Sequence, residues 1–118
     1  MAAKDTVGRY GEDVAARHLI EQGLVVLHRN WRCELGEIDI IARDGDCLVV
    51  CEVKTRRSGS FGSPAEAVTP RKVARLRRLA ARWLAESGLH PPLVRIDVIA
   101  VRRPRSGPAQ VEHLRSVA

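Results

Sequence analysis

The chain has 118 residues, of which 45% are hydrophobic and 29% are charged, and this composition predicts one soluble globular domain rather than a disordered chain. The net charge of +6 favours a polyanionic partner, nucleic acid before anionic membrane, although many small basic proteins bind nothing specific. No run approaches the roughly 18 apolar residues of a membrane span and the N-terminus has no apolar signal segment, so we expect a cytoplasmic protein without a membrane partner.

The three cysteines are odd in number and contain no Cys-X-X-Cys pair. This spacing argues against a disulfide scaffold and against a cysteine-based zinc site, and it fits a reducing compartment. Cys47 and Cys51 share a predicted strand face with Val49 and Val53, so we interpret both cysteines as small apolar core residues.

Helix and strand patterns are interspersed along the chain. The Asp44-Gly45 pair between two apolar runs predicts a hairpin turn, Asn30 marks a bend, and Thr69-Pro70 predicts the start of a helix. Phe61 can either stack on a base or fill the core. In chain order, the predicted elements are a helix over 6–23, strands over 24–33, 36–43 and 46–56, a glycine- and serine-rich loop over 56–64, a helical turn over 65–68, a helix over 70–87, a strand over 93–101, a basic connection over 102–110 and an edge strand over 111–114.

Charged residues interrupt the two apolar runs that flank the hairpin turn. Glu37 and Asp39 lie in the first run, and Glu52 and Lys54 lie in the second. Such groups are costly in buried strands unless they are paired or bound to a ligand. A period of two predicts one face with Glu37, Asp39 and Ile41, an opposite face with Ile38, Ile40 and Ala42, and a shared face in the next strand for Leu48, Val50, Glu52 and Lys54. Whether the two charged sets meet depends on a register that the pattern leaves open.

This arrangement can build a site for metal-dependent phosphodiester hydrolysis. Asp39 and Glu52 can offer carboxylates, and the Val53 carbonyl can offer a third oxygen, to Mg²⁺ or Mn²⁺. Lys54 can orient a water molecule and stabilise developing negative charge, and Glu12 can complete the metal shell. The alternatives are a surface ion pair between Glu52 and Lys54, and a first-turn glutamate at Glu12 that favours the helix dipole.

A stripe of basic residues follows one face of the helix predicted over 70–87. Arg71, Arg75, Arg78 and Arg82 recur at spacings of four, three and four, and Lys72 lies beside them. Like charges in a row repel one another, and a phosphate backbone would offset that cost. The alternative is an ordinary solvated helix face.

Together these residues resemble the bacterial YraN family, also called UPF0102, over roughly residues 8 to 115. The resemblance rests on Gly11-Glu12 with Ala15 and Ala16, Asn30-Trp31-Arg32, Gly36-Glu37-Ile38-Asp39, Glu52-Val53-Lys54-Thr55-Arg56, Phe61-Gly62, Ala67-Val68, Lys72 and Arg95-Ile96-Asp97-Val98. That family is similar in fold to the PD-(D/E)XK nucleases, particularly the archaeal-type Holliday junction resolvases. The resemblance implies an α/β fold with a mixed central sheet flanked by helices, and a restriction-endonuclease-like core.

The resemblance also implies roles for individual residues. Asp39, Glu52 and Lys54 match the nuclease motif, and Glu12 matches the helix-borne acid of the resolvases. The chain departs from the motif at Ile38, where the motif has proline. Residues expected to contact the substrate by this resemblance are Thr55, Arg56 and Lys72.

The sequence thus predicts a single nuclease-like domain over residues 1–118 that cuts DNA, including branched DNA, with Mg²⁺ or Mn²⁺. Arg71, Arg75 and Arg78 would hold phosphates, and symmetric cutting of a two-fold junction would favour a homodimer. The alternatives are a non-catalytic nucleic-acid-binding or recombination and repair accessory protein that retained the fold, and a protein-interaction module with a basic face.

Overall fold

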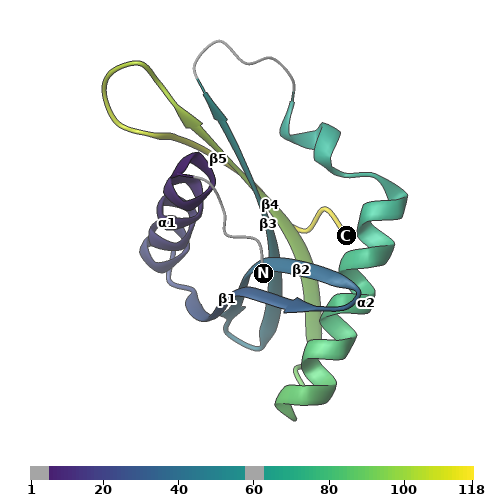
Figure 1. Ribbon diagram of the computed structural model, residues 1–118. Helices are drawn as coiled ribbons and strands as arrows, with labels where there is room; N and C mark the ends of the chain where they lie inside the picture. The colour runs from purple at the N-terminus through teal and green to yellow at the C-terminus, as the bar shows by residue number, and fades with distance from the viewer. Residues whose placement is uncertain (1–5, 58–62) are drawn as a thin grey trace.

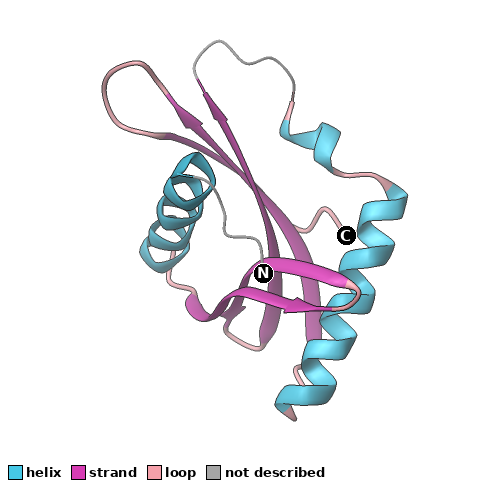
Figure 2. Cartoon of the chain, in the orientation of Figure 1, coloured by secondary structure: helices cyan, strands magenta, loops and turns pink. Residues whose placement is uncertain are grey.

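The computed structural model describes residues 6–57 and 63–118, and in this part of the chain a mixed five-stranded sheet lies between two α-helices (Figure 1). The helices are α1 (Thr6–Glu21), α2 (Pro70–Ser87) and a short 3-10 helix, η1 (Pro64–Ala67). The strands are β1 (Val25–Cys33), β2 (Gly36–Asp44), β3 (Cys47–Arg57), β4 (Leu93–Arg103) and β5 (Gln110–Leu114). The predicted α/β class, with helices flanking a mixed sheet, is confirmed (Figure 2). Phe61, for which a core or base-stacking role was predicted, lies outside the described residues.

The strands follow one another across the sheet in the order β1-β2-β3-β4-β5. The β1–β2, β2–β3 and β4–β5 pairs are antiparallel, whereas β3 and β4 are parallel. Parallel neighbours need a crossover connection, and α2 supplies it between β3 and β4. β3 is therefore the middle strand, with β2 and β4 on either side, and β1 and β5 form the edges of the sheet.

Local end signals set the bounds of both helices. The Thr69 hydroxyl accepts a hydrogen bond from the Lys72 backbone N–H at 3.1 Å, and Gly88 ends α2 with a φ of 74°, as the sequence predicted. α1 ends two residues earlier than predicted, at Glu21. Gly23, with a φ of 89°, lets the Leu24 N–H reach back to the Leu19 carbonyl at 3.0 Å and close the helix.

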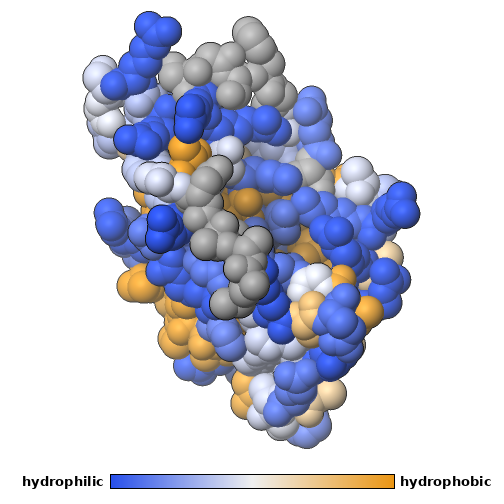
Figure 3. Space-filling model, viewed as in Figure 1, coloured by the Kyte–Doolittle hydropathy of each residue, from blue (hydrophilic) through white to orange (hydrophobic). Residues whose placement is uncertain are grey.

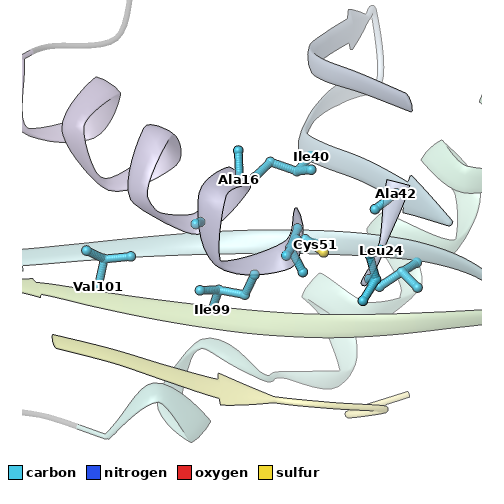
Figure 4. Packing of buried hydrophobic residues seen from close by; sticks show 10 residues of the cluster. Ala16, Leu24, Ile40, Ala42, Cys51, Ile99 and Val101 are labelled. Atoms are coloured by element: carbon cyan, nitrogen blue, oxygen red, sulfur yellow. The ribbon is translucent and has the colours of Figure 1, made fainter. Parts of the chain in front are cut away.

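Each face of the sheet has its own hydrophobic core. The α1 side contains Ala15, Ala16, Leu19, Leu24, Ile40, Ala42, Val49, Cys51, Ile99 and Val101, many of them shown in Figure 4. The α2 side contains Trp31, Ile38, Ile41, Leu48, Val50, Leu76, Leu79, Ala80, Trp83 and Ile96. Cys51 is fully buried and Cys47 packs against the first cluster, which confirms the prediction that both are core residues. Burial raises the pKa of the Cys51 thiol, so this group stays protonated.

α1 lies close to the sheet because it presents glycine and alanine to it. A methyl group on Gly11 would overlap the Thr55 hydroxyl oxygen and would lie 2.8 Å from the Thr55 Cβ and Cγ2 atoms. Thr55, which the resemblance predicts to contact substrate, therefore packs beneath α1.

We expect Gly11→Ala to lower the free energy of unfolding by about 1–3 kcal/mol, because the added methyl group overpacks the interface with Thr55. The sign is diagnostic, since alanine in place of glycine inside a helix normally stabilises by about 1 kcal/mol. Urea denaturation measures the change, with Arg17→Ala on the exposed side of α1 as the control. Adding Thr55→Ala should restore part of the loss, and a stabilised Gly11→Ala protein would contradict the packing argument.

Candidate functional site

The site begins where the ladder between β2 and β3 ends. Backbone pairing runs from Asp44–Cys47 to Ile40–Cys51 and then stops. One residue further on, the Asp39 carboxylate accepts a hydrogen bond from the Val53 backbone N–H at 2.8 Å. The Asp39 side chain therefore replaces the backbone as hydrogen-bond acceptor where the ladder ends. This bond orients the Asp39 carboxylate, and the residue is only 7% exposed.

β2 also changes face at Asp39. Ile38 packs in the core beneath α2, whereas Ile40 packs in the core beneath α1, although residues two apart on a regular strand share a face. The predicted common face for Ile38, Ile40 and Ala42 is therefore wrong at its first member. The neighbouring β1 bends at the same level, because Asn30 has a left-handed φ of 54°, which confirms the bend predicted there.

On β3, Glu52 and Lys54 lie on the α2 side, as the shared face with Leu48 and Val50 predicted. Lys72 at the start of α2 reaches down to Glu52, with 2.7 Å between its Nζ atom and Oε1. Both side chains are largely shielded, with 19% of Lys72 and 13% of Glu52 exposed. Water and salt therefore screen this ion pair less than an exposed one.

The pKa of Lys54 responds to burial and to the charges of three neighbouring side chains. Burial lowers the pKa of the Lys54 ammonium, and the positive charge of Lys72 lowers it further. The carboxylates of Glu52 and Asp39 act in the opposite direction on the same pKa. The tertiary structure thus brings together Asp39, Glu52 and Lys54, the three predicted catalytic residues, and adds Lys72.

Glu12 is held on the α1 side of the sheet. It is 1% exposed, and its Oε1 atom accepts hydrogen bonds from Arg29 Nε at 2.9 Å and from Asn30 Nδ2 at 2.7 Å. Arg29 bonds Asp13 as well, and this contact is the leading cause of the raised pKa of its guanidinium. Glu12 is therefore a buried carboxylate with charged partners, and the alternative of a first-turn surface glutamate is wrong.

The donor set suits one kind of metal. Among residues 6–57 and 63–118, no three His, Cys, Asp or Glu side chains gather into a group that could hold an ion. Mg²⁺ does not need such a cage, because proteins commonly hold it through one or two carboxylates while it keeps several waters and binds substrate phosphate. Asp39 and Glu52 lie on neighbouring strands, and the Val53 backbone is bonded to Asp39. Their oxygens match that requirement in charge and in ligand type.

The basic stripe lies next to this cluster. A groove on α2 is lined by Thr69, Arg71, Lys72, Arg75 and Arg78, which include four of the six residues predicted to bind nucleic acid. Arg82 ends the stripe differently, because it bonds Glu34 at 2.7 Å and Glu86 at 2.8 Å. These two carboxylates, Glu34 first, raise the pKa of the Arg82 guanidinium and compensate its positive charge.

The sequence did not reveal a buried network at the other edge of the sheet. Asp97 is fully buried and accepts hydrogen bonds from His113 at 2.7 Å, from the Ser116 N–H at 2.9 Å and from Arg95 at 3.1 Å. Arg95 also bonds Asp44, and His113 contacts His18 of α1 at 3.0 Å. His113 and Ser116 are distant from Asp97 in sequence, so only the shared face of Arg95 and Asp97 could be predicted. The network fastens β5 and α1 to the centre of the sheet.

None of the helices in the described part of the chain is long and apolar enough to cross a membrane.

Comparison with known proteins finds one matching family and many similar proteins. The model of the uncharacterised protein family UPF0102 matches residues 11–101. A UPF0102 protein of Kineococcus radiotolerans is 64% identical over 117 residues, covering 98% of this chain and 96% of that protein. A UPF0102 protein of Beutenbergia cavernae is 63% identical, with 99% of each chain covered, and one of Streptomyces coelicolor is 59% identical over this whole chain and 92% of its own length.

Proposed function

This chain belongs to the uncharacterised family UPF0102, and on that premise we propose that it is an endonuclease-like enzyme that hydrolyses DNA phosphodiester bonds with Mg²⁺ or Mn²⁺. The observation that supports the proposal most directly is the gathering of two carboxylates and two lysines at the end of the β2–β3 ladder. Lys72 pairs with Glu52, but gathered charges with a shifted pKa, like that of Lys54, are also typical of functional sites.

In this mechanism Asp39 and Glu52, with the Val53 carbonyl, would hold the metal ion. The chemistry it would supply there is neutralisation of phosphate charge and a lowered pKa for a water molecule. The Val53 N–H holds the Asp39 carboxylate in one orientation. Hydrogen bonds of this kind orient the ligands of metal sites. Lys54 positions the attacking water and stabilises the negative charge that develops on the phosphate oxygens.

The chain's own cations share the work of substrate binding. Lys72 holds Glu52 at 2.7 Å before substrate arrives, and its ammonium is close enough to the cluster to contact a phosphate. Arg71, Arg75 and Arg78 line the adjoining groove, where they would hold the flanking backbone. Glu12, which is bonded to Arg29 and Asn30, would add a carboxylate on the α1 side of the sheet.

The decisive experiment is a cleavage assay on duplex, flap and four-way-junction DNA with Mg²⁺, with Mn²⁺ and with a chelator. We expect product only with a divalent ion, and a preference among the three substrates would identify the DNA structure that is bound. A purified protein that yields no more product with metal than with chelator on all three substrates would overturn the enzymatic function.

One contact also supports a second function, a DNA-binding accessory protein that retained the nuclease-like site. The Lys72 ammonium already neutralises Glu52 without a metal ion. Titration with Mn²⁺ separates the two functions, because metal binding to the folded chain produces heat and raises the melting temperature. Absence of both signals favours the accessory protein.

Under either function we expect Arg71→Ala/Arg75→Ala to weaken DNA binding in a salt-dependent way. Each lost phosphate contact should reduce the slope of log K against log salt by about 0.9, so the double variant should lose about 2. Fluorescence anisotropy in the presence of a chelator measures this. Arg77→Ala, on another face of α2, is the matched control and should bind as the wild type does. An unchanged salt slope in the double variant would show that the groove is not the binding surface.

A further inference from the structure

A second concentration of arginines lies at the far end of the two central strands. The parallel register places Arg56 of β3 beside Arg102 of β4, and Arg57 beside Arg103. Arg105 follows in the turn after β4. We call these five residues the arginine arm. Adjacent like charges on paired strands repel each other, so the arm carries an electrostatic cost that a polyanion would relieve.

The arm is basic on both of its faces. Even-numbered residues of β3 and β4 face α2 and odd-numbered residues face α1, as the two hydrophobic cores show. Arg56 and Arg102 therefore lie on one face, where they line a hollow with Gln110 and Glu112. Arg57, Arg103 and Arg105 line a separate hollow on the other side.

The guanidinium groups of the arm have few counter-charges. In the described part of the chain, no ion pair joins any of the five arginines to a carboxylate. Glu112, opposite Ala100, is the acidic residue that lines the hollow with Arg56. Arg103 rests its guanidinium 5.1 Å above the ring of Tyr10, which holds it in place without neutralising it.

The arm is also well placed for a groove. In Figure 1 the ends of β3 and β4, with the β4–β5 hairpin, project beyond both α-helices. Hydrophilic side chains cover the β4–β5 hairpin at the top of Figure 3. The last pair between β4 and β5 is Arg102–Gln110, so at Arg57 and Arg103 only β3 and β4 remain paired. The major groove of B-form DNA, about 12 Å wide, admits a two-stranded ribbon, and cations on both faces of such a ribbon can meet the two backbones.

We infer that the arginine arm enters a groove of double-stranded DNA, with Arg56 and Arg102 contacting the phosphates of one strand and Arg57, Arg103 and Arg105 contacting those of the other. A single strand has one backbone and can satisfy only one face of the arm. The inference rests on the DNA binding in the proposed function and is independent of cleavage.

The position of the arm relative to the carboxylates supports this geometry. Glu52, Lys54 and Arg56 lie on one face of β3 at steps of about 6.6 Å, since a strand rises about 3.3 Å per residue. Arg56 is thus on the order of 13 Å from Glu52 along the strand. A duplex held by the arm would present its backbone to the candidate metal site.

The test compares the binding of a short DNA duplex and of one of its single strands, both in a chelator, by fluorescence anisotropy. Three variants are needed: Arg57→Ala/Arg103→Ala/Arg105→Ala, Arg56→Ala/Arg102→Ala, and the control Arg17→Ala/Arg43→Ala/Arg77→Ala. The control removes three exposed arginines from other surfaces and so matches the first variant in charge. Circular dichroism confirms that each variant is folded.

At salt concentrations between about 50 and 200 mM we expect each arm variant to bind the duplex at least about tenfold more weakly than wild type. The slope of log K against log salt should become shallower by about 0.9 for each arginine that contacts phosphate. Single-strand binding should fall by a much smaller factor. The inference is overturned if either face can be removed without loss, if the control loses as much, if both DNA forms lose equally, or if wild type binds no duplex. If the arm variants bind duplex DNA normally and metal-dependent cleavage persists, the inference about the arm is overturned and the proposed function is not.

Discussion

Replacing Asp39 by alanine is expected to reduce metal-dependent DNA cleavage by about a thousandfold, which corresponds to about 4 kcal/mol of transition-state stabilisation. Asp39 is the carboxylate that the end of the β2–β3 ladder orients through the Val53 N–H. Its loss removes both the proposed metal ligand and a negative charge whose effect on the pKa of Lys54 is opposite to that of Lys72. Single-turnover cleavage of the best substrate in Mn²⁺ measures the change.

Two further variants separate chemistry from folding. Asp39→Asn retains an oxygen that can accept from the Val53 N–H, so it should keep the stability of the wild type more closely while still losing most of the activity. Asp46→Ala removes an exposed carboxylate from the turn at the other end of the β2–β3 ladder and should cleave as the wild type does. If Asp39→Ala and wild type have equal activity, Asp39 is not a catalytic residue and the proposed metal site is wrong.

The second large effect concerns stability. Asp97→Ala is expected to lower the free energy of unfolding by about 3–5 kcal/mol, because it leaves the charge of Arg95 and the donors of His113 and Ser116 without their buried acceptor. Domains of this kind are stable by only about 5–15 kcal/mol, so the variant should be close to unfolding. Urea denaturation at neutral pH measures the loss.

The same carboxylate predicts a dependence of stability on pH. Burial alone would raise the pKa of Asp97, but hydrogen bonds from His113, the Ser116 N–H and Arg95 outweigh it, so the folded pKa lies below the ordinary value. A depressed folded pKa stabilises the fold above the unfolded pKa of about 3.9, and this contribution is lost as pH falls through the folded value. We therefore expect wild type to lose stability below about pH 4 more steeply than Asp97→Asn does.

Controls for this network are available within the chain. Asp46→Ala, at an exposed position, should change the free energy of unfolding by less than about 0.5 kcal/mol. Asp97→Asn supplies the measurement if Asp97→Ala does not fold, since it preserves the shape of the side chain and removes only the charge. A loss in Asp97→Ala no larger than that in Asp46→Ala would mean that the network does not fasten β5 and α1.

Secondary structure was predictable because its signals are local. The span of α2 follows from Thr69, Pro70 and Gly88, which act through hydrogen bonds and backbone angles within a few residues. The hairpin around Asp44-Gly45 follows equally from its turn and flanking apolar runs. The face of Ile38 was predicted incorrectly, because a regular period of two cannot anticipate that β2 changes face at Asp39.

The sequence by itself determined the α/β class, the two helices, the hairpin and the identity of the charged residues that the strands carry. Only the tertiary structure decided which charges meet: Lys72 with Glu52, Glu12 with Arg29, and Asp97 with His113. Those pairs join residues distant in sequence, and their formation depends on strand register and on helix placement against the sheet. For the same reason the arginine arm became visible only when the parallel register set Arg56 beside Arg102.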